Sequence, residues 1–312
     1  MSPASPYHPP MASSHDYAQD QRNAHVLVSI NGELKPRPEA QVSVFDSGFL
    51  MGDGVWEGLR LYNGTVPYLA EHLERLFEGS KAIDLDIGHS REELTEQIYR
   101  TTEANEMISG VHIRLMVTRG LKATPFQGPS VNLGGPTIVI AAEWKEPDPA
   151  LFDQGLKLMT VHVRRGRPDV QDPSWNSHSK LNCVTACIQA SKMGADEGIM
   201  LDPHGFVATC NSTHFFIVRD GELWTSSGRY CLPGITRANM LRLAKENGIS
   251  TAERDFTLTK VYSADEAFCT GTFAGIIPVR EVDGRIISDG RAGPVTQRLR
   301  DLYQEEIRAL CS

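Results

Sequence analysis

The feature that most limits how this chain can fold is a series of short strand-like segments that meet at tight turns. Asn-Gly pairs at 31–32 and 63–64 each separate two such segments, and Asn-Gly is the strongest short-range signal for a two-residue β-hairpin turn. Two stretches between the strands, at 71–83 and 91–107, carry apolar residues at helical spacing instead. Hairpins require antiparallel neighbours, so residues 25–147 predict a small α+β domain.

The second half of the chain repeats this mixture of strands and helices on a larger scale. A Pro- and Asp-rich crossing at 148–156 predicts a linker, and residues 157–312 after it predict the larger domain. Short strands separated by turns fill 197–225. Residues 1–24 are rich in Pro, Ser and His, so they predict a disordered tail. The expected fold class is therefore α+β with two domains.

Composition excludes several classes of protein. The chain is 40% hydrophobic and 22% charged, as a folded globular protein is. Its net charge is −8 without any Lys/Arg block, so it is not expected to bind nucleic acid. No apolar run reaches about 18 residues, so no membrane span is expected. Six cysteines form no CxxC pair or zinc spacing and no secretory signal precedes them; we therefore expect reduced thiols, no metal site and a cytoplasmic location.

Two turns could hold a phosphate through backbone groups. Residues 232–237 read LPGITR, a Pro-Gly turn that runs straight into a helix for which Thr236 is a reasonable N-cap. Free N–H groups and the helix dipole make such a helix start an anion site, although a plain turn and cap explains this motif alone more simply. Residues 271–275 (GTFAG) form a second small-residue turn, which lets a backbone approach a ligand closely.

Lys180 has two interpretations. It stands at the start of an otherwise apolar helix, in the stretch WNSHSKLNCV. It is either a surface lysine whose stem covers apolar groups or a desolvated amine suited to Schiff-base chemistry. A nucleophilic lysine and two phosphate-binding turns together match what pyridoxal phosphate requires, because its aldehyde needs an amine and its phosphate needs backbone donors and a cation.

Several motifs occur in an order that resembles a known family. They are SVFDSGFLMGDGVWEGLR, EHLERL, SKLN, DPHGFVATCNSTHFFIV, LPGITR and GTFAGIIPVREVDG, spread over about residues 26–290. The chain thereby resembles the class IV (fold type IV) pyridoxal-phosphate aminotransferases, which include branched-chain and D-amino-acid aminotransferases, (R)-selective amine transaminases and aminodeoxychorismate lyase. The resemblance implies a small α+β N-terminal domain, a larger C-terminal domain built on a β-barrel-like core with flanking helices, and a homodimer with shared active sites.

The resemblance also assigns roles to individual residues. Lys180 matches the catalytic lysine, which forms the Schiff base with the cofactor and later moves the proton. Four residues match the groups that bind the cofactor phosphate: Arg75, Ile235, Thr236 and Thr272. Five residues fall at positions that line the substrate pocket: Phe49, Trp56, Arg114, Phe273 and Ala274. From the residues alone, Arg75 could instead be a solvated helix arginine, and Phe49 and Trp56 could be core packing.

Two departures from the family pattern bear on the chemistry. Thr209 takes the place of the glutamate that contacts the cofactor's ring nitrogen, and His214 takes the place of an asparagine. A carboxylate keeps that nitrogen protonated and the ring a strong electron sink, whereas a hydroxyl only exchanges a hydrogen bond. The Arg-x-His pair of D-amino-acid aminotransferases is absent after residues 118–120, while Arg114 stands where branched-chain enzymes carry an arginine.

The expected activity is a pyridoxal-phosphate-dependent transamination between an amino acid or primary amine and a keto acid. It would follow a ping-pong mechanism in a branched-chain-like or amine-accepting pocket, with small-molecule donors and acceptors as the partners. Three alternatives remain: a D-amino-acid aminotransferase, a lyase that resembles aminodeoxychorismate lyase, and a non-catalytic relative that binds the cofactor. Release of pyruvate without a keto-acid acceptor separates a lyase from a transaminase, and Thr209 keeps the non-catalytic alternative open.

Overall fold

The computed structural model describes residues 14, 15 and 17–312, and the chain forms two compact units. The N-terminal unit comprises residues 18–146, 174–180 and 305–312, and the C-terminal unit comprises residues 147–173, 181–304 and the described residues up to Tyr17. The disordered tail predicted over residues 1–24 falls mostly outside the described residues. Its last part contains the 3-10 helix η1, Gln21–Ala24.

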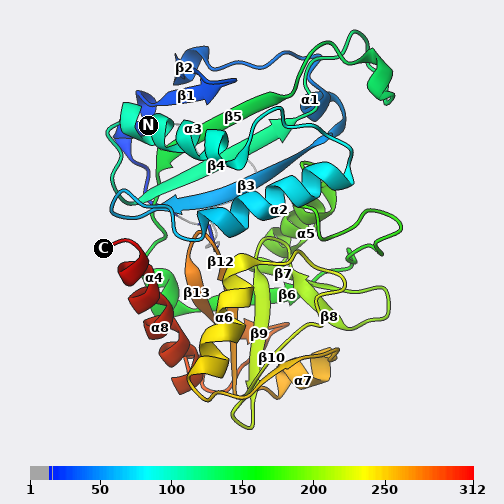
Figure 1. The fold of residues 1–312 in the computed structure, drawn as a ribbon. Helices are drawn as coiled ribbons and strands as arrows, with labels where there is room; N and C mark the ends of the chain where they lie inside the picture. The colour runs from blue at the N-terminus through cyan, green and yellow to red at the C-terminus, as the bar shows by residue number, and fades with distance from the viewer. Residues whose placement is uncertain (1–13, 16) are drawn as a thin grey trace. The chain divides into compact units, whose positions relative to one another are not determined.

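The N-terminal unit is built on an antiparallel sheet with the strand order β2-β1-β5-β4-β3 (Figure 1). Its strands are β1 (Leu27–Ile30), β2 (Glu33–Pro36), β3 (Gly54–Leu61), β4 (Val111–Thr118) and β5 (Thr137–Trp144). Asn31 and Gly32 join β1 to β2 with positive φ angles of 50° and 80°, the geometry that a two-residue hairpin turn requires. The first hairpin predicted from the sequence is therefore confirmed.

Two helices cover one face of this sheet, α2 (Leu69–Ala82) and α3 (Arg91–Ala104) (Figure 1). α3 begins at a capping box, in which the side chains of Ser90 and Glu93 each accept from the other's backbone N–H. Shorter helical segments are α1 (Ser47–Met51), η2 (Arg37–Glu39) and η3 (Pro129–Val131). The apolar core between helices and sheet includes Leu59, Leu73, Leu76, Leu94, Ile98 and Ile113, each at most 2% exposed.

The two faces of this sheet differ in character, as β4 shows. Successive side chains of a strand point to opposite faces, and burial alternates along β4 from Val111 onward. Ile113 and Leu115 are fully buried in the core under the helices, whereas Arg114 between them is partly exposed on the opposite face. The face opposite the helices therefore carries Arg114.

A segment distant in sequence, residues 174–180, extends the same sheet beyond β3. The N–H of Trp56 donates to the carbonyl of Asn176 over 2.9 Å, and the N–H of His178 donates to the carbonyl of Gly54 over 3.0 Å. Residues 176–178 therefore run antiparallel to β3 as a short additional edge. The predicted catalytic lysine stands at the end of this segment.

The C-terminal unit is built on a mixed sheet with the order β11-β10-β9-β12-β13-β6-β7-β8, and β14 pairs with β13. Its strands are β6 (Leu156–Thr160), β7 (Glu197–Leu201), β8 (Val207–Cys210), β9 (His214–Arg219), β10 (Glu222–Thr225), β11 (Thr251–Glu253), β12 (Glu266–Gly271), β13 (Gly275–Val282) and β14 (Arg285–Ile286). The sheet curls where a tight turn joins β8 to β9, closed by a 3.0 Å bond from the N–H of Cys210 to the carbonyl of Thr213. The α+β class and the barrel-like core predicted from the sequence are confirmed.

Helices flank this curled sheet (Figure 1). They are α4 (Ala150–Gln154), α5 (Leu181–Lys192), α6 (Ile235–Glu246), α7 (Leu258–Tyr262) and α8 (Pro294–Leu310). α6 and α8 pack against one face of the sheet through an apolar cluster that includes Phe216, Met240, Phe268 and Leu299. The rings of Phe216 and Phe268 stack there with centroids 4.9 Å apart. This packing holds α6 against β9 and β12.

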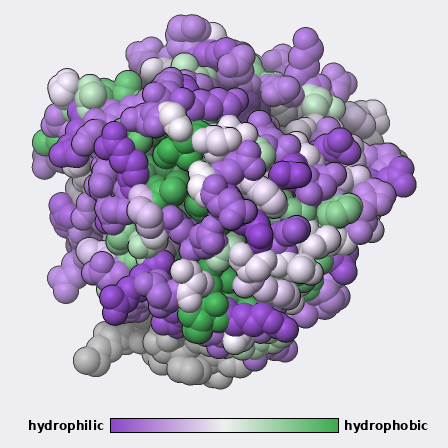
Figure 2. Space-filling view, turned by 90° about the horizontal axis from the view of Figure 1, so that it is seen from below, coloured by the Kyte–Doolittle hydropathy of each residue, from purple (hydrophilic) through white to green (hydrophobic). Residues whose placement is uncertain are grey.

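No helix among the described residues combines the length and the apolar character that a bilayer span requires. Figure 2 shows one face of the protein that is largely hydrophilic, with hydrophobic residues gathered in small patches. Scattered apolar side chains of this kind are normal on the surface of a folded protein.

Candidate active site

Lys180 is held at the edge of the N-terminal sheet. It follows the segment that pairs with β3, and α5 begins at the next residue, Leu181. Its Nζ lies 5.7 Å from the centroid of the Trp56 ring. Trp56 is itself fixed, because its Nε1 donates to the carbonyl of Ser177 over 3.0 Å. Main-chain pairing with β3 therefore determines where this lysine stands.

Positive charge gathers around Trp56. Arg114 lies over the ring with its Cζ 3.7 Å from the centroid, which is a cation–π contact. Burial lowers the pKa of His178, and the nearby charges of Arg114 and Lys180 lower it further. His178 is therefore neutral near pH 7, and its Nε2 is buried without a hydrogen-bond partner among the described residues. The surroundings of Lys180 suit a ligand that brings negative charge.

Arg75 of α2 is not a solvated helix arginine. Its side chain is only 10% exposed, and its Nε and Nη2 donate to the two carboxylate oxygens of Glu57 over 2.8 and 2.7 Å. His72 bonds the same carboxylate through Nδ1 at 2.7 Å. Burial raises the pKa of Glu57, but His72 and Arg75 together hold it below its usual range. One buried carboxylate thus fixes the planar guanidinium that the sequence assigns to the cofactor phosphate.

The two aromatic candidates of the N-terminal unit behave differently. Trp56 is partly buried beside Lys180. Phe49 in α1 is 72% exposed, so the alternative that Phe49 belongs to the core is wrong. The structure brings Trp56, Arg114 and Lys180 together, and it leaves Phe49 on the surface of this unit.

The start of α6 offers backbone donors in the C-terminal unit. The sequence suggested Thr236 as the N-cap, but the N-cap is Gly234, whose extended backbone makes no side-chain cap bond. The suggestion was wrong because the backbone is already helical from Ile235 onward, which places Thr236 inside the first turn. The first N–H groups of a helix have no partner within the helix, so Ile235 and Thr236 present donors at the positive end of the dipole.

His214 lies directly against this helix start. A Cβ added to Gly234 would stand 2.4 Å from His214 Nε2, so only glycine permits this approach. His214 of β9 is paired in register with Thr270 of β12. The Thr270 hydroxyl is buried and has no hydrogen-bond partner among the described residues. A buried, unsatisfied hydroxyl is costly, and an oxygen-rich anion that bound the uncapped start of α6 beside His214 could also accept from Thr270, the register partner of His214.

The turn 271–275 follows directly after Thr270. Thr272 and Ala274 are partly exposed within this turn, whereas Phe273 between them is only 5% exposed. The turn joins β12 to β13, which pair antiparallel up to Gly271 and Gly275. Thr270 was missed in the sequence because one threonine inside an apolar strand gives no signal until its neighbour on β9 is known.

The hydroxyl proton of Thr209 is taken up by a hydrogen bond to a neighbouring backbone carbonyl. Its side chain is buried, and its Oγ1 donates to the carbonyl of Thr213 over 2.8 Å. The hydroxyl is therefore left with lone pairs only, so toward any other group it can act solely as an acceptor. A carboxyl group does lie nearby in this unit, since Thr213 Oγ1 donates to Glu197 Oε2 over 2.7 Å.

Glu197 is an acid that sequence reasoning did not identify. It opens β7, whose residues are all buried, and Ser212 Oγ also donates to it over 2.8 Å. Burial raises the pKa of Glu197 to about 7, although Thr213 and Ser212 oppose the shift. The carboxyl group is therefore poised between its neutral and charged forms near physiological pH.

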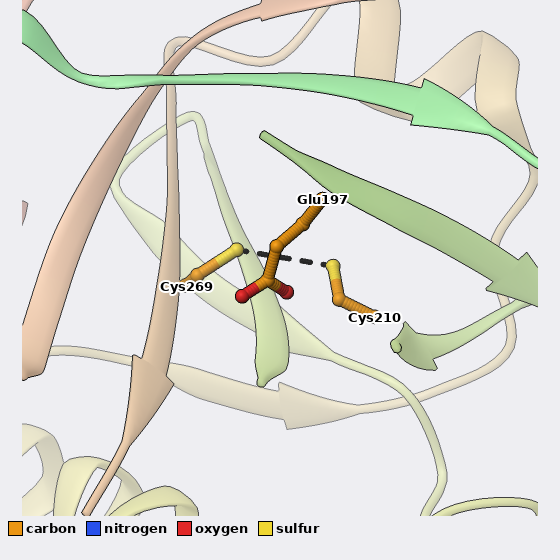
Figure 3. Close-up of side chains that lie close together, drawn as sticks. All are labelled: Glu197, Cys210 and Cys269. Carbon is orange, nitrogen blue, oxygen red and sulfur yellow. Dashed lines mark hydrogen bonds between the residues drawn. The ribbon is translucent and has the colours of Figure 1, made fainter. Parts of the chain in front are cut away.

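Glu197 shares its buried position with two thiols (Figure 3). The Sγ atoms of Cys210 and Cys269 are 3.8 Å apart, and the contact with Cys269 and burial raise the pKa of Cys210 well above its usual value. The carboxyl oxygens are already taken by hydroxyl donors. The cluster is therefore a buried, hydrogen-bonded part of the sheet interior.

Comparisons with known proteins agree with these features. Residues 54–282 match the family model described as amino-transferase class IV. The chain is 36% identical over 283 residues to the branched-chain-amino-acid aminotransferase of Pseudomonas aeruginosa, which covers 89% of this chain and 91% of that protein. It is 34% identical over 290 residues to a D-alanine aminotransferase of Listeria monocytogenes, with coverage of 91% and 97%.

One of the relatives is much longer. The chain is 41% identical over 285 residues to the branched-chain-amino-acid aminotransferase-like protein 1 of Arabidopsis thaliana, but the match covers 91% of this chain and 51% of that protein. The chain thus spans about half the length of this relative.

Solved structures share the fold. The T.th. branched-chain amino acid aminotransferase, complexed with N-(5'-phosphopyridoxyl)-L-glutamate, superposes with a TM-score of 0.84 at 32% identity and covers 92% of this chain and 95% of its own. The branched-chain amino acid aminotransferase of Escherichia coli gives a TM-score of 0.82 at 31% identity, with coverage of 90% and 93%. The fold type expected from the motifs is thereby confirmed.

Proposed function

Because the chain belongs to the class IV aminotransferase family, we propose that it is a pyridoxal-phosphate-dependent transaminase. It would move an amino group between an amino acid or primary amine and a keto acid in a ping-pong reaction. The observation that carries this proposal is the position of Lys180, a primary amine fixed by main-chain pairing beside Trp56 and Arg114. A lysine placed this way is suited to bind an aldehyde and then to move a proton.

The residues of the C-terminal unit fit the phosphate of that cofactor. The start of α6 is uncapped, and the Thr270 hydroxyl beside it is buried without a partner among the described residues. Gly234 lacks the Cβ that would keep His214 away from this start. We assign the phosphate to the N–H groups of Ile235 and Thr236 with Thr272, and to the guanidinium of Arg75 that Glu57 orients.

When bound, pyridoxal phosphate supplies an aldehyde for the amino group and a ring that takes up the electron pair of the substrate carbon. Lys180 would hold the cofactor by its aldehyde, because its Nζ is the primary amine that the site provides for this. The same Nζ would act as the general acid and base that moves the proton at the substrate carbon. Arg114 provides the positive charge that attracts the carboxylate of a donor or acceptor.

Thr209 sets the electronic limit of this chemistry. Its hydroxyl proton is donated to Thr213, so Thr209 can accept one hydrogen bond from a protonated ring nitrogen but cannot supply a charge. The ring is then a weaker electron sink than with a carboxylate in this place. We propose that the reaction runs with a less charged ring, and that proton transfer by Lys180 is the slower step.

The substrate class that we propose is a branched-chain-like amino acid or a primary amine. Trp56, Arg114, Phe273 and Ala274 would line the pocket, and Phe49 would join from the surface of a second copy. The exposure of Val44 (63%), Phe45 (43%) and Phe49 (72%) supports a homodimer, because such a group is suited to burial against another subunit. The six cysteines are free thiols, which supports a cytoplasmic location.

Absorbance during titration with single amino donors tests this function. L-leucine, L-glutamate, D-alanine and (R)-1-phenylethylamine are added separately to the holoenzyme. We expect the cofactor band to bleach with L-leucine or the amine, and a keto acid to restore it. Bleaching by D-alanine alone would move the enzyme to the D-amino-acid class. Pyruvate release without an acceptor would indicate a lyase, and no response to any donor would refute a catalytic role.

A further inference from the structure

A short segment near the N-terminus is attached to the C-terminal unit. The strap, as we call Ser14, His15 and Tyr17, is the described part of this segment. Ser14 is 1% exposed, and its hydroxyl bonds the carboxyl group of Glu197 and lies 2.9 Å from His15 Nδ1. At the other end, Tyr17 forms an antiparallel bridge with Pro147. The strap is thus held on both sides of His15.

The ring of His15 lies flat against Phe273 in the turn 271–275. The ring centroids of His15 and Phe273 are 5.5 Å apart, and the ring planes differ by 9°. This is an offset stack of two aromatic rings, an arrangement that aromatic pairs favour. Phe273 is left only 5% exposed, although it stands between the partly exposed Thr272 and Ala274. The strap therefore changes what this turn presents to a ligand.

We infer that His15 is a specificity-determining residue of the enzyme, which covers the apolar face of Phe273 and limits the substrate side chain that the turn accepts. The inference rests on the proposed function, since Phe273 and Ala274 are taken there as substrate residues. A side chain that reaches the turn meets the imidazole of His15 in place of the phenyl ring. Small or polar substituents are then favoured over bulky apolar ones, because a site discriminates by what it fills and by what it leaves unpaired.

The anchor at Ser14 keeps His15 in place. Ser14 Oγ reaches the same Glu197 oxygen, Oε1, to which Ser212 donates. Removal of this hydroxyl from its buried site would leave the carboxyl group with one donor fewer, which is unfavourable in a dry interior. The burial of Ser14, which is 1% exposed, therefore shows that the strap is attached to the C-terminal unit at this residue.

Kinetics of three variants test the role of His15. His15→Ala uncovers Phe273, whereas His15→Phe keeps a ring in place; His25→Ala alters an exposed histidine of the same region and serves as the matched control. The ratio of kcat/KM for L-phenylalanine to that for L-alanine is measured in each. We expect this ratio to rise roughly tenfold in His15→Ala, the effect of a small change in pocket size, to rise by less in His15→Phe, which keeps the covering ring but not its polarity, and to stay near the wild-type value in His25→Ala. An unchanged ratio in His15→Ala would overturn the inference.

Chemical modification provides a readout that needs no turnover. The holoenzyme is treated with diethylpyrocarbonate, and the modification rates of His15 and His25 are followed by mass spectrometry of peptides. We expect His15 to react several-fold more slowly than His25, and Phe273→Ala to remove the difference. Equal rates in the wild-type protein would refute the docked strap. If no donor bleaches the cofactor but His15 is protected, the proposed function fails while the strap itself is confirmed.

Discussion

The two units handle buried polar groups in opposite ways. In the N-terminal unit, one buried carboxylate, Glu57, is charged and holds two basic groups, Arg75 and His72. In the C-terminal unit, the buried carboxyl of Glu197 is surrounded by hydroxyl donors and has a pKa near 7, while Thr270 has no hydrogen-bond partner among the described residues. In the first unit a buried carboxylate holds the guanidinium of Arg75 in a fixed orientation. In the second unit the buried carboxyl group is surrounded by uncharged hydroxyl donors.

Lys180→Ala is expected to have the largest effect, because it removes the amine that the N-terminal sheet positions. Turnover should fall by more than about a thousandfold, the scale that a proton-transfer group contributes, while the fold is kept by the main-chain pairing of residues 176–178 with β3. Single-turnover kinetics with an accepted donor measures the loss. Lys192→Ala at the end of α5 is the control and should retain activity; comparable loss in both variants would contradict the assignment.

Glu57→Gln tests the charged carboxylate of the N-terminal unit. It leaves the guanidinium of Arg75 buried without its counter-charge, so the free energy of unfolding should fall by about 3–5 kcal/mol at neutral pH. Because the folded-state pKa of Glu57 is lowered, its stabilisation is present above the usual carboxyl pKa and is lost as the pH falls through the lower folded value. Urea unfolding at several pH values measures this.

A surface pair of the same unit is the matched control for Glu57. Glu143 contacts Arg37 at 2.8 Å, and both side chains are at least 35% exposed. Glu143→Gln should lower the free energy of unfolding by no more than about 1 kcal/mol. If the two variants lose the same stability, Glu57 does not organise the charges of the N-terminal unit.

Glu197→Gln tests the buried carboxyl group of the C-terminal unit, and its pH dependence should have the opposite sign. The pKa of Glu197 rises from 4.5 to about 7 on folding, so the folded state binds the extra proton and wild-type stability decreases as the pH rises between these values. The variant lacks this penalty. Relative to wild type it should gain about 3 kcal/mol between pH values of about 5 and 8. A pH-independent difference in urea unfolding would show that Glu197 is already ionised.

Gly234→Ala should have the smallest effect, confined to the cofactor. The added Cβ would stand 2.4 Å from His214 Nε2, so His214 must move away from the start of α6. We expect the Kd for pyridoxal phosphate to rise roughly tenfold, which is about 1.4 kcal/mol. Gly135→Ala, whose Cβ meets nothing within 4 Å, is the control. Equal affinity for pyridoxal phosphate in both variants would show that the start of α6 does not bind the phosphate.

Local chemistry was sufficient to predict many elements of the fold, but the second hairpin was wrong, because only an isolated Tyr62–Thr65 bridge follows β3 and no strand forms among the described residues between β3 and α2. The Asn31-Gly32 turn and the stripes of α2 and α3 depend on neighbours within a few residues. The motif order also indicated the curled sheet of the C-terminal unit, because it identified a family and not because any pattern encodes curvature. The N-cap at Thr236 was wrong, since two adjacent positions of a turn are both chemically acceptable and only the backbone decides between them.

The pairings between distant segments could not be predicted. Residues 176–178 read Asn-Ser-His, which has no strand pattern, yet they pair with β3 and thereby place Lys180. Arg75 lies off the apolar stripe of its helix, and only its contact with Glu57, 18 residues earlier, shows that it is buried. The role of Glu197 depends on Thr213 and on Ser14, 183 residues earlier in the chain. These contacts exist only in the folded chain.

Reductive trapping tests the central assignment most directly. The holoenzyme is treated with sodium borohydride, digested, and searched by mass spectrometry for a lysine that carries the reduced phosphopyridoxyl group. We expect the group on Lys180, and no labelled lysine in Lys180→Ala. Labelling of a different lysine in the wild-type protein, or unchanged labelling in Lys180→Ala, would contradict the proposal that the edge of the N-terminal sheet carries the catalytic amine.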